Sequence, residues 1–113
     1  MLFRSPQLGH VGLHEAEAQA KFPDRQIKIA TMPMSSVARA VETAETRGLM
    51  KAVIDGESGA ILGFTCLGIE GGEIMSLVQV AMMGGVEWWR LRDAVFAHPT
   101  LAEGLNNLWG SLK

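Results

Sequence analysis

The chain has 113 residues, a net charge of −2 and 48% hydrophobic residues, which suits one domain with a single modest core. Its scattered basic residues form no electrostatic footprint for nucleic acid or an anionic membrane, and its apolar stretches are too short to span a bilayer. The N-terminus lacks the layout of a signal peptide, and the single cysteine excludes an internal disulfide and suits the cytoplasm.

Two kinds of hydrophobic periodicity follow one another along the chain, without repeats or an evident linker. Alternation of apolar and polar residues predicts strands, and apolar residues three or four positions apart predict helices. The predicted strands span residues 10–13, 26–31, 48–54 and 60–67, and the predicted helices span 15–21, 37–44, 73–83, 87–96 and 100–112. Turn-forming residues at 55–59 join the last two strands in a hairpin, and Gly84-Gly85 ends the third helix. Hairpins followed by helices indicate one α+β domain over residues 1–113, an antiparallel sheet with helices packed against it.

The stretch with the clearest chemical meaning is His98-Pro99-Thr100-Leu101-Ala102-Glu103. A histidine exchanges protons near neutral pH, and a nearby carboxylate can hold its tautomer, which is what a general acid/base requires. Pro99 restricts the backbone of His98 to extended conformations. A purely structural interpretation also fits, because Thr100 and Glu103 have the spacing of a helix capping box.

Other residues that could carry chemistry have plain structural explanations. His10 and His14 are four residues apart, but a strand-to-helix junction separates them and no third ligand is near, so we predict no metal site. Cys66 lies among apolar residues of a predicted strand, and we interpret it as a small buried hydrophobe and not a reactive thiol.

The large apolar side chains exceed what a core of this size is expected to hide. The chain has three tryptophans and seven methionines, several of them on helices that flank His98. Adaptable methionines and large aromatic side chains are typical of the centre of an interface, so we predict a two-fold homodimer. The alternative is that these side chains fill the core of a monomer.

The chain resembles the C-terminal dimerisation domain of the flavin-dependent pyridine nucleotide-disulfide oxidoreductases, the family of glutathione reductase and dihydrolipoamide dehydrogenase. The sequence FAHPTLAEGLNNLW at residues 96–109 is similar to the family's C-terminal signature. The segments at 3–13, 15–18, 48–55 and 61–63 resemble its opening and central hairpin, in the same order. The Met-Pro-Met segment at 32–34 together with the HPT-x-x-E-x-L ending resembles the mercuric-reductase-like branch.

This resemblance implies roles for three residues. By position, His98 is the acid/base that reaches into the partner subunit's active site, and Glu103 orients it. His98 and Pro99 are implied as flavin contacts. A departing thiolate leaves faster when a proton is ready for it, so these roles suit thiol–disulfide exchange. Some members of the mercuric-reductase-like branch act on substrates other than disulfides, so the acceptor stays open.

The resemblance also implies parts that this chain lacks. Family members bind FAD and NAD(P)H in two further domains, whereas this sequence has no G-x-G-x-x-G turn and no C-x4-C pair. We therefore expect an isolated C-terminal domain that binds no cofactor and catalyses nothing alone, and that works in the intact, cytoplasmic oxidoreductase. The alternative function is a stand-alone homodimeric interaction or regulatory module. A small-molecule binding domain has no supporting site in the sequence.

Overall fold

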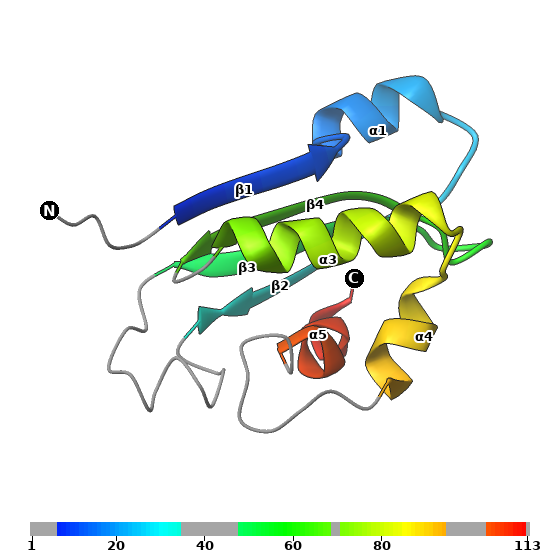
Figure 1. Ribbon diagram of the computed structural model, residues 1–113. Helices are drawn as coiled ribbons and strands as arrows, with labels where there is room; N and C mark the ends of the chain where they lie inside the picture. Colours follow the sequence, from blue (N-terminus) through cyan, green and yellow to red (C-terminus); the bar gives the residue numbers. More distant parts are fainter. Residues whose placement is uncertain (1–6, 35–47, 69–70, 95–103, 113) are drawn as a thin grey trace, which may run out of the picture.

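The computed structural model describes residues 7–34, 48–68, 71–94 and 104–112. Its strands form one sheet in the order β1-β4-β3-β2, in which every neighbouring pair is antiparallel (Figure 1). The strands are β1 (Gln7–Gly12), β2 (Ile27–Pro33), β3 (Leu49–Asp55) and β4 (Ile61–Gly68). The helices are α1 (Glu15–Lys21), α3 (Gly71–Met83), α4 (Trp88–Asp93) and α5 (Gly104–Asn107), and the 3-10 turn η3 (Leu108–Ser111) follows α5. The predicted α+β class with an antiparallel sheet is confirmed.

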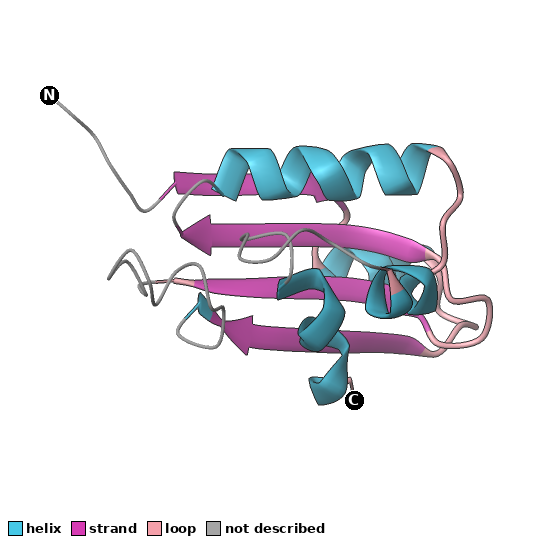
Figure 2. Cartoon of the chain, turned by 60° about the horizontal axis from the view of Figure 1, so that its bottom comes forward, coloured by secondary structure: helices cyan, strands magenta, loops and turns pink. Residues whose placement is uncertain are grey.

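The register of the strands gives the sheet two different faces, because successive side chains of a strand point to opposite sides. One face is covered by α3, α4 and α5 (Figure 2) and holds the core. Its rows run across three strands: Met32, Met50 and Cys66 in one row, and Ala30, Ala52 and Phe64 in the next. On the opposite face, Leu8, Leu67 and Leu49 lie in register, and Thr65 and Lys51 follow in the next row. One end of that face meets α1.

Helix α3 packs an apolar stripe onto β1 and β4. Ile74 and Val78, one turn apart, are buried in the core. The helix ends where predicted, at Gly84-Gly85. The amide of Gly85 donates to the carbonyl of Met82 at 3.1 Å, and Val86 donates to Ala81 at 3.0 Å, which is a Schellman motif. Gly85 has the positive φ of 69° that this motif requires.

The outer edge of the sheet at β2 is closed by the C-terminal 3-10 turn. The amide of Thr31 donates to the Ser111 hydroxyl at 2.8 Å, and this hydroxyl donates to the Thr31 carbonyl at 2.7 Å. One side chain therefore satisfies both backbone groups that an edge strand leaves open at this residue.

The two C-terminal helices differ from the prediction. Periodicity predicted a helix through residue 96, whereas α4 ends at Asp93 and Ala94 is already extended, with φ −67° and ψ 151°. The last helix was predicted as α-helix from Thr100 onward. In the described part it is α-helical over Gly104–Asn107 and then tightens into the 3-10 turn. We attribute the tightening to the hydrogen bonds that hold Ser111 at the edge of β2.

The other predicted elements are present with shifted ends, have the predicted bounds or lie outside the described residues. Strand β1 covers Gln7–Gly12 where residues 10–13 were predicted, and β2 covers Ile27–Pro33 where residues 26–31 were predicted. Helix α1 has the predicted bounds, and the hairpin of β3 and β4 forms around the turn at residues 55–59. The helix predicted over 37–44 lies outside the described residues. Within the described ranges, no helix has both the length and the apolar character needed to cross a membrane.

Candidate functional site

The predicted site residues His98, Pro99 and Glu103 lie in the segment 95–103, outside the described residues. The structure does describe both flanks of this segment. Its N-terminal flank is α4 with Ala94, and its C-terminal flank is α5 with η3. The elements on these flanks hold the two ends of the segment.

The N-terminal flank is tied to the sheet's hairpin and to the core. The amide of Trp88 donates to the carbonyl of Gly59 at 3.0 Å, which fixes the start of α4 at the hairpin turn. Leu91 is buried in the core cluster. The guanidinium of Arg92 lies 5.1 Å from the ring centre of Trp88, close enough for a cation–π contact. Helix α4 thus has a fixed position against the sheet.

The C-terminal flank is anchored more deeply. Leu105 and Leu108 are fully buried in the core. The indole nitrogen of Trp109 donates to the carbonyl of Leu105 at 2.6 Å, so the one polar atom of this buried ring is satisfied. The predicted apolar side of the last helix is confirmed at these positions.

Asn106 joins the two flanks. Its side-chain nitrogen Nδ2 lies 2.8 Å from the carbonyl oxygen of Ala94, 3.0 Å from that of Leu91 and 3.2 Å from that of Arg92. Sequence reasoning did not single out Asn106, because its partners are 12 to 15 residues away. The structure shows why α4 accepts these bonds, because its early end leaves carbonyl groups in need of donors.

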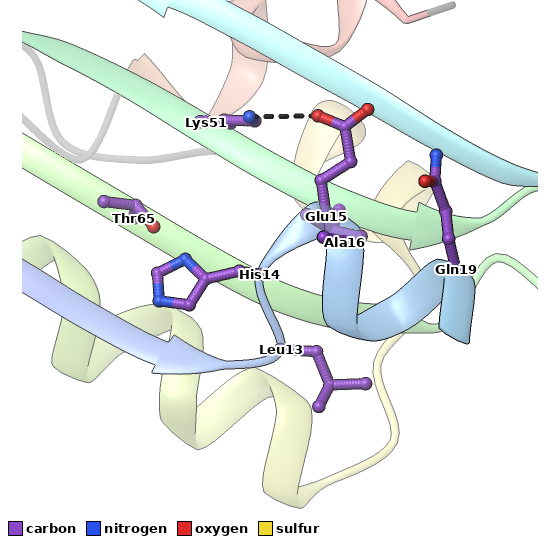
Figure 3. A pocket seen from close by; sticks show the side chains of 8 residues that line it. Leu13, His14, Glu15, Ala16, Gln19, Lys51 and Thr65 are labelled. Atoms are coloured by element: carbon purple, nitrogen blue, oxygen red, sulfur yellow. Dashed lines mark hydrogen bonds and ion pairs between the residues drawn. The ribbon is translucent and has the colours of Figure 1, made fainter. Parts of the chain in front are cut away.

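A second group of polar residues lies on the open face of the sheet, beside α1. A pocket of about 420 Å³ there is lined by residues of α1, of the connection that leads into it and of the two central strands (Figure 3). The lining residues are Leu13, His14, Glu15, Ala16, Gln19, Lys51, Val53 and Thr65. The ammonium of Lys51 is 3.1 Å from the carboxylate of Glu15, and this ion pair links β3 to the first turn of α1.

The imidazoles of His10 and His14 are stacked beside this pocket, which the sequence did not predict. Their ring centres are 3.8 Å apart and their planes differ by 6°. Nε2 of His10 donates to the carbonyl of Gly12 at 2.9 Å, and Nδ1 pairs with the Thr65 hydroxyl at 2.7 Å. Both nitrogens of His10 are therefore engaged within the protein. In the described part of the chain, no three histidine, cysteine or carboxylate side chains come together as metal ligands.

The remaining local prediction concerns Cys66. Cys66 is fully buried, as predicted, and burial raises the pKa of its thiol to about 11. It is therefore protonated at neutral pH and does not supply a thiolate.

Helix α1 begins with a capping contact. His14 precedes α1 in an extended conformation, and its backbone amide donates to the Glu17 carboxylate at 2.9 Å, as in the reciprocal half of a capping box.

Comparisons with known proteins agree with the fold. The family model for the pyridine nucleotide-disulphide oxidoreductase dimerisation domain matches residues 1–108. The chain is 33% identical over 112 residues to the probable pyridine nucleotide-disulfide oxidoreductase RclA of Escherichia coli, covering 99% of this chain and 25% of that protein. It is 36% identical over 103 residues to a dihydrolipoyl dehydrogenase of Corynebacterium glutamicum, covering 91% of this chain and 22% of that protein.

A solved structure gives the same result in three dimensions. The HOCl-induced flavoprotein disulfide reductase RclA from Escherichia coli superimposes with a TM-score of 0.85 at 32% identity, covering 93% of this chain and 24% of that one. The chain thus spans about a quarter of the length of these relatives.

Proposed function

The chain belongs to the dimerisation-domain family of the pyridine nucleotide-disulfide oxidoreductases, and from this premise we propose that it serves a larger enzyme that uses FAD and NAD(P)H. In this proposal it forms the two-fold contact of a cytoplasmic homodimer. It also supplies His98 and Glu103 as an acid/base dyad to the active site of the partner subunit. The observation that carries the proposal is the family match, which spans the HPT-x-x-E motif.

The topology of the described residues supports the proposal that other domains of the enzyme bind the two cofactors. A dinucleotide-binding turn lies between a strand and a helix of a parallel βαβ unit. All strand pairs of the described chain are antiparallel, and the sequence has no G-x-G-x-x-G turn. These residues do not fit a cradle for FAD or NAD(P)H. We therefore assign both cofactors to the other domains of the intact enzyme, with only His98 and Pro99 contacting the flavin.

The proposed chemistry of the dyad is proton transfer during thiol–disulfide exchange. A thiolate attacks one sulfur of a disulfide, and the other sulfur departs as a thiolate that needs a proton. His98 holds that proton, and Glu103 keeps its imidazole in the orientation and tautomer for the transfer. The similar solved protein is described as a flavoprotein disulfide reductase, which supports a disulfide as the acceptor class.

Substitution of His98 in the full-length enzyme tests this role. His98→Ala should lower turnover with a disulfide substrate by roughly two to four decades, the usual contribution of a positioned acid/base. Folding should be nearly unchanged, because Thr100 and Glu103 still provide the cap residues. His14→Ala is the matched control, since it removes an exposed histidine to which the proposal gives no role. Wild-type turnover of His98→Ala would leave Thr100 and Glu103 with a capping role only.

The alternative, a stand-alone homodimeric module, makes a different prediction about the natural polypeptide. If FAD- and NAD(P)H-binding sequence precedes this chain in the same polypeptide, the enzyme is favoured. If the natural protein consists of these residues alone, the module is favoured.

A further inference from the structure

The contacts of Asn106 are unusual for a single side chain. An amide nitrogen carries two protons and cannot accept, so Nδ2 donates to all three carbonyls, and one of its protons is shared. All three acceptors lie at the end of α4, where the last carbonyl groups of a helix lack internal donors. The carbonyl of Leu91 also accepts from the amide of Ala94, over a longer distance of 3.4 Å. Asn106 therefore caps the C-terminal end of α4, although it lies 12 residues after the C-cap residue Ala94 in the sequence.

The capping residue is itself held in place. Asn106 lies on α5 between two fully buried residues, Leu105 directly before it and Leu108, the first residue of η3, two positions after it. Ala94 is the last described residue before the segment 95–103, and Gly104 is the first after it. The hydrogen bonds of Asn106 thus connect both ends of the segment that carries His98, Pro99 and Glu103.

We propose that Asn106 is a positioning residue for the His98–Glu103 dyad. This inference rests on the proposed function. It adds that the hydrogen bonds of Asn106 set the distance between the two ends of the segment that carries the dyad. Asn106 acts through His98 and need not touch substrate or cofactor. Displacement of a reacting group by about 1 Å can lower a rate by about 100-fold, so a fixed separation of the two ends matters for catalysis.

The test replaces the donor by an acceptor of the same shape. In the full-length enzyme, Asn106→Asp places a carboxylate against three carbonyl oxygens, so the two ends should move apart. We expect kcat to fall at least about tenfold, in line with the effect of a displaced reacting group, while KM for the nicotinamide donor and the flavin content stay unchanged. Asn107→Asp is the matched control, because it makes the same change at the exposed neighbouring residue and should keep wild-type kcat.

A double-mutant cycle with His98→Ala separates positioning from general support of the fold. If Asn106 acts through His98, Asn106→Asp should cost nothing further in kcat once His98 is alanine. An equal loss in both backgrounds would overturn the proposal, as would wild-type kcat of Asn106→Asp. If Asn106→Asp does not fold, Asn106→Ser removes most of the contacts without adding charge and is used in the same cycle. If His98→Ala alone leaves turnover unchanged, the proposed function itself fails.

Discussion

Among single residues, Asp55 has the most distinctive surroundings in the described chain. Its side chain is buried at the end of β3, where the hairpin turn begins. Oδ1 accepts from the amide of Glu57 at 2.9 Å, and Oδ2 accepts from Nη1 of Arg25 at 2.8 Å. The bond from the Glu57 amide, helped by Arg25 and Ser58, outweighs burial and lowers the pKa of the Asp55 carboxyl below its ordinary value.

This lowered pKa gives the stability of the domain a pH dependence. Because the pKa is lower in the folded state than in the unfolded state, the ionised carboxylate stabilises the fold above the unfolded pKa of about 3.9. The contribution is lost as the pH falls through the folded pKa. Asp55→Asn should therefore lower the free energy of unfolding at pH 7 by about 1–3 kcal/mol, and by less at pH 3.

Urea unfolding at both pH values measures this difference. Asp24→Asn is the control, because it removes an exposed carboxylate and should have little effect at either pH. An equal loss for Asp55→Asn at pH 7 and at pH 3 would contradict the assigned role of the charge.

At the level of elements, the connection from β1 to α1 depends on a close backbone crossing at Gly63. The amide of Leu13 donates to the carbonyl of Leu62 at 2.9 Å as the chain passes over β4. A Cβ atom at Gly63 would lie 1.8 Å from the carbonyl oxygen of Leu13. Only glycine lets the two backbones approach this closely, and the crossing places α1 on the open face of the sheet.

Gly63→Ala should therefore force this connection away from β4. We expect the free energy of unfolding to fall by about 3 kcal/mol, at the upper end of overpacking costs. Gly110→Ala is the matched control, because a Cβ there meets no atom within 4 Å. Chemical denaturation of the two variants measures the contrast, and equal midpoints for both would show that the crossing tolerates a side chain.

The elements also show what the sequence could predict. The bounds of α1 and the β3–β4 hairpin followed from local signals, namely hydrophobic periodicity and turn formers at residues 55–59. The early end of α4 and the 3-10 turn at Leu108–Ser111 did not, because they depend on Asn106 and Ser111 bonding to residues 12 to 80 positions away. The residues of the proposed dyad came from family resemblance, whereas Asn106 became visible only through its contacts.

At the scale of the whole molecule, some large apolar side chains are buried in the core and others lie on the surface. The expectation that a core of this size cannot hide all the large side chains is confirmed for the described residues, although Trp109 and three methionines are buried. These four are buried within one chain: Met32, Met34, Met50 and Trp109. Other large apolar side chains remain exposed, among them Trp89 at 37% on α4 and Met83 at 80% on α3. The case for self-association therefore depends on these exposed residues and on the family.

We predict that the isolated chain forms a two-fold dimer in the micromolar range, and that Trp89 contributes to the contact. Trp89 lies on α4, the helix that leads into the segment carrying His98, and tryptophan is enriched among residues that dominate binding. A glutamate at this position would bury an unpaired charge in the contact, and the two-fold axis would repeat this charge in the partner subunit. Trp89→Glu should therefore raise the dissociation constant at least about tenfold, equivalent to about 1.4 kcal/mol. Sedimentation velocity over a concentration series measures the dissociation constant of the dimer. Gln79→Glu is the control, because it adds the same charge at an exposed position of α3.

A wild-type chain that stays monomeric throughout the series would contradict the dimer. Equal weakening of the dimer by both variants would contradict the role of Trp89.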